Sequence, residues 1–369
     1  MTMASSTDTT SYPGVSIETL EHTFSDLHPV YMKKFKPISS PPLAKLVFVH
    51  GYDDHIGRYY DFFPTLAQKG ISVIAWDQRG WGASAKTAAQ YGHTGTTEMV
   101  LNDIVHVIRS ELSDMKIEDD TEAAPVFVMG HSMGGAQVLT LASDPKYLDL
   151  MPKVRGWLLE SPHIALVPSA EPSALKIFAG RLAGRLLPTF KIKHKMPADQ
   201  VTRDPEVQKS LNEDPLLRAT GTLQGMSGLL DRAADLSAGK RKLNEGVKSL
   251  WLAHGTADLS VSYEASKKWF DTHCQNVPDA TLKTYEGWSH QLHADMPDNR
   301  HIFANDVADW ILARASGPLG REETKQGDVR PVAPAAPEDG QTKEPSEVPK
   351  VADRADENAS VKPVNAHKL

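Results

Sequence analysis

The sequence predicts an α/β fold in which helices flank a mostly parallel central sheet and a helical cap is inserted between two strands. Solid apolar runs alternate with segments of helical periodicity along most of the chain, as expected of parallel strands that are buried on both faces. The apolar run that ends at Met129 leads directly into Gly130-His131-Ser132-Met133-Gly134-Gly135 and a helix-like segment. This pattern indicates a strand, a sharp turn and a helix.

Composition limits the class of protein and its partners. The chain has 369 residues and is 40% hydrophobic, which is enough to bury a full core. Its net charge of -7 argues against nucleic acid as a partner, because phosphate binding requires net or clustered positive charge. The only cysteine is Cys274, so an intramolecular disulfide is excluded and a reducing compartment is expected.

The chain shows no sign of secretion or of a membrane span. Its first residues are rich in Ser and Thr and carry neither a basic start nor an apolar run, which argues against a secretory signal. No apolar stretch approaches the roughly 18–20 residues that cross a bilayer. We therefore expect an intracellular, cytoplasmic protein that is soluble or lies on a membrane surface.

The predicted elements follow one another in a regular order. Segments 16–24 and 30–35 alternate in polarity and predict two antiparallel strands at the edge of the sheet. Further strands are predicted at 43–49, 71–76, 126–129, 154–159, 249–253 and 280–285, and helices at 59–68, 98–112, 263–272 and 302–313.

Two segments interrupt this order, and they set the predicted domain boundaries. Residues 162–236 lose the strand-like runs and become helical in period with Pro breaks, which predicts an inserted cap. Residues 317–369 contain no aromatic residue, Ile, Met or Cys, so this tail cannot bury enough apolar area to become ordered. The prediction is a disordered start at 1–14, a core at 15–161, the cap at 162–236, a second part of the core at 237–316 and the tail.

The sharp turn makes Ser132 the candidate nucleophile. A G-x-S-x-G motif forces the central serine into a strained backbone conformation, so the flanking positions must be small. The motif alone is weak, because Gly and Ser are common and chance matches occur. The strand before it and Gly134-Gly135 after it favour the catalytic interpretation.

A serine nucleophile needs a base and an acid, and the chain offers both in the expected order of Ser, Asp and His. Asp258 lies in a loop after the predicted strand at 249–253, and His290 lies in the loop after the strand at 280–285. Taken singly, Asp258 could cap a turn and His290 could be a surface histidine. Their shared position after strands of one sheet predicts that they act together with Ser132.

Backbone donors for an oxyanion are predicted at two places. One is the amide of Met133 at the start of the helix, and the other is the amide of Tyr52, which follows His50-Gly51 after the strand at 43–49. The alternative for His50-Gly51 is a plain turn at the end of a strand.

These motifs resemble the monoacylglycerol lipase-like branch of the α/β-hydrolases, and the resemblance covers about residues 16–316. Beyond G-H-S-M-G-G it rests on His50-Gly51 with Gly57-Arg58-Tyr59, on 77–84, on Glu213-Asp214-Pro215-Leu216 and on Tyr285-Glu286-Gly287 with His290, Leu292 and His293.

The resemblance implies an α/β-hydrolase fold and a set of roles. Ser132, Asp258 and His290 would form a catalytic triad, and the amides of Tyr52 and Met133 would stabilise the oxyanion. Asp54, Arg58 and His131 would help to seat the glycerol end of the substrate. The family commonly carries a smaller residue at position 52, so Tyr52 is expected to narrow or reshape the acyl entrance.

The predicted function is hydrolysis of a monoacylglycerol to fatty acid and glycerol through an acyl-enzyme, without a cofactor. A related carboxylesterase or lysophospholipase of the same fold is the close alternative, and a catalytically silent scaffold is the alternative from a different class. Neither a metal nor a nucleotide site is predicted, because no His, Cys and acid cluster has ligand spacing and no phosphate-binding Gly loop is apparent.

The cap contains a possible lipid contact. Residues 176–198 carry six Lys and Arg residues and no acid, with Leu and Phe at roughly helical spacing between them, which is typical of an amphipathic helix at a lipid interface. The alternative is that the leucines pack on the core and the lysines face water. The first interpretation predicts peripheral binding to membranes or lipid droplets.

The C-terminal tripeptide suggests a further location. His367-Lys368-Leu369 differs from a peroxisomal Ser-Lys-Leu signal only at its first residue. A peroxisomal location is therefore an alternative expectation.

Overall fold

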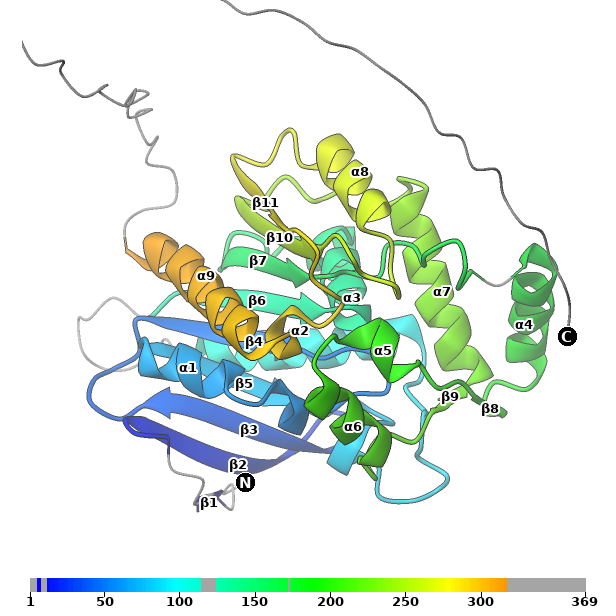
Figure 1. The fold of residues 1–369 in the computed structure, drawn as a ribbon, viewed down its shortest axis with the longest axis horizontal. Helices are drawn as coiled ribbons and strands as arrows, with labels where there is room; N and C mark the ends of the chain where they lie inside the picture. Colours follow the sequence, from blue (N-terminus) through cyan, green and yellow to red (C-terminus); the bar gives the residue numbers. More distant parts are fainter. Residues whose placement is uncertain (1–4, 8–11, 114–123, 172, 317–369) are drawn as a thin grey trace, which may run out of the picture. The chain divides into compact units, whose positions relative to one another are not determined.

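The computed structural model describes residues 5–7, 12–113, 124–171 and 173–316. In this part of the chain, a sheet has the strand order β1-β2-β3-β5-β4-β6-β7-β10-β11 (Figure 1). Its strands are β1 (Ser5–Thr7), β2 (Val15–Thr23), β3 (Pro29–Pro37), β4 (Ala44–Val49), β5 (Ile71–Trp76), β6 (Val126–His131), β7 (Val154–Glu160), β10 (Ser249–Gly255) and β11 (Asp279–Tyr285).

The sheet is parallel from β5 to β11 and antiparallel at the edge formed by β1, β2 and β3. This confirms the predicted α/β class with a mostly parallel sheet. Every residue of β5, β6 and β10 is buried, which explains why these strands are solid apolar runs in the sequence.

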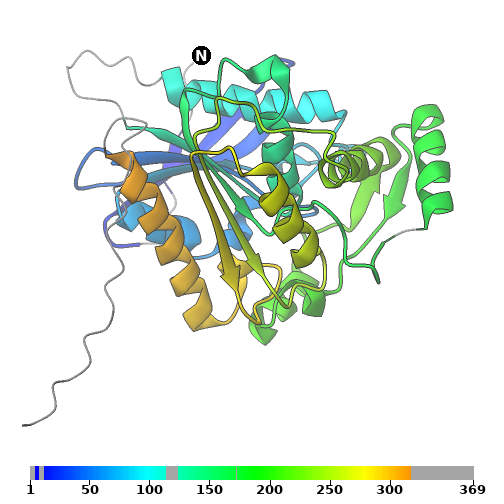
Figure 2. The ribbon, with the colours of Figure 1, turned by 90° about the horizontal axis from the view of Figure 1, so that it is seen from above.

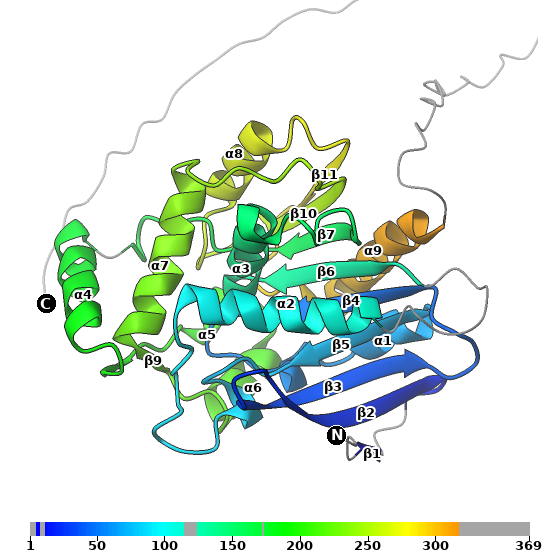
Figure 3. The same ribbon diagram turned by 180° about the vertical axis from the view of Figure 1, so that it is seen from behind.

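Helices cover both faces of the sheet, as Figures 2 and 3 show from two further sides. The helices outside the cap are α1 (Phe62–Gln68), α2 (Thr97–Ser113), α3 (Met133–Ala142), α8 (Tyr263–His273) and α9 (Pro297–Ala315). One apolar core joins the sheet to α2, α3 and α8, and a second joins it to α1 and α9. The sheet is therefore buried between two helical layers.

Short 3-10 helices occupy several turns. They are η1 (Ile56–Tyr59), η2 (Gly82–Ser84), η3 (Pro145–Tyr147) and η4 (Leu292–Ala294). The helix predicted at 59–68 is thus divided into η1 and α1. Tyr60 lies between them with φ of 38°, a left-handed conformation that interrupts a right-handed helix.

The segment between β7 and β10 forms the cap, with helices α4 (Ala174–Leu186), α5 (Ala198–Val201), α6 (Pro205–Glu213) and α7 (Leu223–Ser237). It also contains an antiparallel ribbon of β8 (Lys191–Lys193) and β9 (Thr220–Thr222). The sequence predicts only helical periodicity here. Strands of three residues are too short to show an alternating pattern, so the ribbon was not predictable.

Some predictions concern segments that the structure covers only in part. Within the start that is predicted to be disordered, β1 pairs with β2. The tail at 317–369, with its C-terminal tripeptide, lies outside the described residues, and the domain boundaries remain predictions. Among the helices of the described ranges, none combines the length and the apolar character that crossing a membrane requires.

Candidate active site

Ser132 lies at the sharp turn between β6 and α3. Its backbone has φ of 52° and ψ of -115°, a left-handed conformation that is strained for a residue with a side chain. The amide of Ser132 donates to the carbonyl of Glu160, and its carbonyl accepts from the amide of His163. These bonds fix the turn, so the serine hydroxyl is held where β6 ends.

The glycines around Ser132 are required by close backbone contacts. A Cβ at Gly130 would lie 2.4 Å from the carbonyl oxygen of Gly134, and a Cβ at Gly134 would lie 2.2 Å from the carbonyl oxygen of Val49. Real Cβ atoms do not approach other atoms so closely. The G-x-S-x-G pattern therefore allows α3 to pack against the ends of β6 and β4.

Asp258 lies in the loop after β10 and is buried. Its Oδ1 accepts the amides of Ser260 and Val261 at 2.8 and 3.0 Å. Its Oδ2 accepts from Nδ1 of His290 at 2.7 Å and from Nε2 of His254 at 3.0 Å. The structure thus joins the predicted acid and the predicted base directly, and it adds a second histidine.

The pKa values of this pair move in opposite directions. Burial alone would raise the pKa of the Asp258 carboxyl, but the charge of His290 and the hydrogen bonds from His254 and His290 outweigh it and hold that pKa well below its usual range. Burial alone would lower the pKa of His290, but Asp258, with smaller effects from Glu160 and Asp54, raises it above 6.5. Each residue stabilises the charged form of the other.

Ser132 and His290 line the same cavity. Within the described ranges, no hydrogen bond joins their side chains. In a site without substrate, such bonds are often long and form only when the substrate is in place. The amide of Gln291, next to His290, donates to the carbonyl of Val201 in α5, so the cap helps to hold the loop that carries the imidazole.

The two predicted oxyanion donors lie beside Ser132. Met133 is the first residue of α3, where the amides have no acceptor within the helix. Tyr52 lies in the loop after β4, which we call the 50–54 loop. Neither amide has an acceptor among the described residues, so both are available to a ligand.

Ser132 and Tyr52 also form part of the wall between two cavities of different character. The smaller cavity, of about 160 Å³, has a mixed lining of polar and apolar side chains; its polar and charged side chains include Asp53, Asp54, Lys195, Asn212, Asp214 and Arg218. The other, of about 340 Å³, lies beneath α4 and α7 and is mostly apolar; its lining includes Leu166, Ile177, Met196, Met226, Leu230 and Val261. Tyr52 thus reaches the apolar cavity, where the sequence predicts its effect.

The three residues predicted to seat glycerol occupy different places. Asp54 and His131 line the smaller cavity. Arg58 is buried and is absent from that lining; its guanidinium donates to Asp214 of the cap at 3.2 Å and to the hydroxyl of Tyr60. The seating role of all three stays a prediction.

Polar contacts tie the 50–54 loop to the cap. The carboxylate of Asp53 accepts the amides of Arg218 and Ala219 at 3.1 and 2.8 Å, and the hydroxyl of Tyr52 donates to the carbonyl of His194. These contacts connect the 50–54 loop, which carries the Tyr52 amide, to the turn before β9 and to the residue that follows β8.

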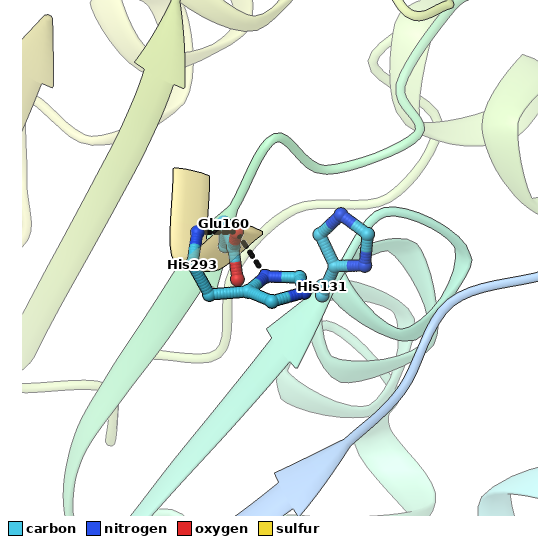
Figure 4. A group of neighbouring side chains, drawn as sticks. All are labelled: His131, Glu160 and His293. Carbon is cyan, nitrogen blue, oxygen red and sulfur yellow. Dashed lines mark hydrogen bonds and ion pairs between the residues drawn. The ribbon is translucent and has the colours of Figure 1, made fainter. Parts of the chain in front are cut away.

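A buried polar cluster consists of His131, which directly precedes Ser132 in the chain, with Glu160 and His293 (Figure 4). Nδ1 and the amide of His293 both contact one oxygen of Glu160, at 2.7 and 3.2 Å. His131 Nε2, His293 Nε2 and Glu160 Oε2 are buried, and they have no hydrogen-bond partner within the described part of the chain. The sequence does not predict this cluster, because its members come from three distant segments.

These three side chains could hold a metal ion, since one ligand atom from each lies within 4.8 Å of the others. Zinc ligands at about 2.1 Å in a tetrahedron lie only about 3.4 Å apart. The cluster fits poorly, because the ligand atoms would have to draw together and the side chains of Glu160 and His293 are fully buried, whereas a metal site needs a path of entry.

His254 and Glu160 are the site residues that sequence reasoning missed. His254 ends the apolar run of β10, and Glu160 ends that of β7. A polar residue at the end of a buried parallel strand, at the same edge as the candidate nucleophile, is the signal that could have identified both.

The parallel sheet, the strained turn and the inserted cap define a hydrolase of the α/β-hydrolase fold. The chain belongs to the family described as serine aminopeptidase, S33, whose model matches residues 40–297.

Two relatives of similar sequence are named as monoglyceride lipases. A putative monoglyceride lipase of Schizosaccharomyces pombe is 28% identical over 322 residues, which are 87% of this chain and 81% of the relative. The monoglyceride lipase of Mus musculus is 28% identical over 290 residues, which are 77% of this chain and 87% of the relative.

Solved structures agree with the fold. A soluble variant of monoglyceride lipase from Saccharomyces cerevisiae, in complex with a substrate analog, has a TM-score of 0.68 and 19% identity and covers 86% of this chain and 97% of that one. Monoacylglycerol lipase of Paleococcus ferrophilus has a TM-score of 0.63 and 25% identity, and the match covers 77% and 99% of the two chains. At 19% identity, the first likeness bears on the fold alone.

Proposed function

We propose that this protein hydrolyses monoacylglycerols to a fatty acid and glycerol, with Ser132 as the nucleophile. The observation that carries this proposal is the position of Ser132 on the wall shared by a mostly apolar cavity and a smaller cavity that contains charged and polar side chains. A monoacylglycerol has an ester bond between one acyl chain and one small polyol. The larger, apolar cavity suits the acyl chain, and the charged and polar side chains of the smaller cavity suit the hydroxyl groups of glycerol.

In the first chemical step, Oγ of Ser132 attacks the ester carbonyl carbon. Nε2 of His290 takes the hydroxyl proton, and Asp258 holds the imidazole with its hydrogen on Nδ1. The amides of Tyr52 and Met133 stabilise the negative oxygen of the tetrahedral intermediate. When the bond to the alcohol breaks, His290 returns the proton to the glycerol oxygen and the acyl group remains on Ser132.

In the second step, water replaces the alcohol. His290 takes a proton from the water, which attacks the acyl carbon, and then gives the proton back to Oγ of Ser132. The products are a fatty acid and the free enzyme. The departure of glycerol through the smaller cavity leaves room beside Ser132 for this water.

Hydrolysis of a substrate panel tests the proposal. The panel contains monoacylglycerols, diacylglycerols and lysophospholipids, each with the Ser132→Ala variant as the blank. We expect the highest kcat/KM for a monoacylglycerol. Faster turnover of lysophospholipids or simple esters would instead indicate the related lysophospholipase or carboxylesterase function.

Labelling with a fluorophosphonate separates an enzyme from a silent scaffold. We expect the probe to react with the wild-type protein and with Ser237→Ala, a control at an exposed serine at the end of α7, but not with Ser132→Ala. A wild-type protein that is folded yet unlabelled would favour the scaffold.

We further propose that α4 rests on the surface of a membrane or lipid droplet. Leu175, Phe178 and Leu186 are 76%, 66% and 73% exposed, whereas Ile177 on the same helix lines the apolar cavity. Lys176 and Arg185 add positive charge. Apolar side chains beside basic ones suit an anionic lipid surface, from which an acyl chain could pass beneath α4.

Co-sedimentation with anionic liposomes tests this contact. We expect Phe178→Ser with Leu186→Ser to reduce binding, and Lys176→Gln with Arg185→Gln to reduce it at low salt. Ile38→Ser is the matched control, because Ile38 is 65% exposed outside the cap. Binding that is the same for all of these variants would contradict the proposal.

A further inference from the structure

His254 is a buried histidine that contacts the acid rather than the substrate cavity. It lies in β10, four residues before Asp258, and its side chain is fully buried. Nε2 of His254 is 3.0 Å from Oδ2 of Asp258, the same oxygen that accepts from His290 at 2.7 Å. His254 is absent from the linings of the cavities at Ser132.

The contact completes the hydrogen bonding of the carboxylate. An ionised carboxylate has about four acceptor positions. Two are filled by the amides of Ser260 and Val261, one by His290 and the fourth by His254. The amides fix Oδ1, so the direction of Oδ2 is determined by the two imidazoles.

The contact also settles which nitrogens carry hydrogen. The Asp258 carboxylate only accepts, so His254 donates from Nε2 and His290 donates from Nδ1. Among the described residues, the buried Nδ1 of His254 has no hydrogen-bond partner, so a hydrogen on Nδ1 would be an unsatisfied donor while Nε2 left the carboxylate without one. Nε2 of His290 is then the unprotonated nitrogen, as a general base requires.

We propose that His254 is a positioning residue for the ester hydrolysis, which holds Asp258 so that its Oδ2 directs and orients the imidazole of His290. This inference rests on the proposed function of Ser132 and His290. The anchor is rigid, because β10 pairs with β7 on one side and β11 on the other, whereas Asp258 belongs to a loop. The hydrogen bond from His254 therefore restrains the loop that carries Asp258 relative to the sheet.

Removal of His254 has two expected consequences. Oδ2 gains freedom to turn away from His290, which lowers kcat without changing substrate binding. While the contact to His290 persists, Oδ2 also keeps more of its negative charge, which stabilises the imidazolium form of His290 and moves the acid limb of the pH profile upward. The titratable groups that face His290 are Asp54, Asp258, Glu160, His131, His163 and His293.

The test compares three substitutions in the full chain. His254→Leu removes the donor, His254→Gln keeps a donor near the position of Nε2, and His254→Asn is too short to reach Oδ2. His301→Leu, at an exposed position of α9, is the control. Each variant is assayed for the rate of fluorophosphonate labelling across pH and for kcat and KM on a monoacylglycerol.

We expect His254→Leu and His254→Asn to lower kcat about tenfold, leave KM unchanged and raise the acid limb of labelling by about half a pH unit. His254→Gln should restore both values toward wild type. If His254→Leu does not fold, the comparison of His254→Gln with His254→Asn tests the inference. The inference would be overturned if His254→Leu or His254→Asn left both kcat and the acid limb of labelling unchanged. It would also be overturned if His254→Gln and His254→Asn had equal defects in these two values.

Fluorophosphonate labelling distinguishes a failure of this inference from a failure of the proposed function. A wild-type protein that does not react with the probe would refute the role of Ser132 itself. A wild-type protein that reacts, with a pH profile that His254→Asn leaves unchanged, would refute only the role of His254.

Discussion

Nδ1 of His290 lies 2.7 Å from Oδ2 of Asp258, although the two residues are 32 positions apart in the chain. The parallel register of β10 and β11 places Gly255 opposite Tyr285, so the loops that follow the two strands leave the sheet side by side. The base and its acid are therefore held together by the sheet rather than by local sequence.

This contact predicts the effect of Asp258→Asn. The amide would present an N–H group toward His290 and favour the imidazole with its hydrogen on the wrong nitrogen. We expect kcat to fall by about 10⁴-fold, as expected of a triad with the wrong tautomer. The measurement is kcat under saturating substrate, with circular dichroism to verify folding. A folded variant with less than a tenfold loss would contradict the triad.

The raised pKa of His290 predicts the pH dependence of activity. The imidazole must be neutral to accept a proton, and its pKa in the free enzyme lies above 6.5. Activity should therefore be present at higher pH and be lost as the pH falls through that raised value. The profile of kcat/KM against pH measures it. An acid limb with its midpoint below 6.5 would be inconsistent with the Asp258 contact.

Gly134 tests the packing that produces the sharp turn. A Cβ at Gly134 would meet the Val49 carbonyl oxygen at 2.2 Å, whereas, outside its own stretch of α4, no described residue has an atom within 4 Å of a Cβ at Gly180. We expect Gly134→Ala to cost about 3 kcal/mol or more of unfolding free energy. Gly180→Ala, the matched control, should stabilise α4 by up to about 1 kcal/mol. Urea denaturation measures both, and equal effects would contradict the close contact.

The ion pair between Arg58 and Asp214 should anchor the cap. Arg58 is buried, and Asp214→Asn would leave its charge without its 3.2 Å partner. We expect a loss of about 2 kcal/mol in unfolding free energy. The control is Asp231→Asn, which breaks the exposed pair with Arg181 and should cost no more than about 0.5 kcal/mol. If both substitutions have the same small effect, the buried pair does not hold the cap.

The sequence predicts the parts of this structure that depend on local sequence patterns. The buried strands are solid apolar runs, and the strained turn requires small residues beside Ser132, so the strand, the turn and the helix could be predicted together. Asp258 and His290 could be located because each follows such a strand. The strands of the ribbon in the cap could not be predicted, since three residues show no periodicity.

The other unpredicted features depend on contacts between distant residues. His254 contacts Asp258, and Glu160 contacts His293, only because neighbouring strands end at the same edge of the sheet. Arg58 donates to Asp214 of the cap and does not itself line the smaller cavity, which follows from how the cap is placed and not from any pattern near Arg58.

The central claim is that Ser132 carries the acyl group of a lipid ester during turnover. The most direct measurement is mass spectrometry of the protein after mixing with a monoacylglycerol and rapid acid quenching. The account predicts the added mass of one acyl group on the peptide that contains Ser132, and no added mass in Ser132→Ala. An acyl group on another residue, or continued hydrolysis by Ser132→Ala, would contradict it.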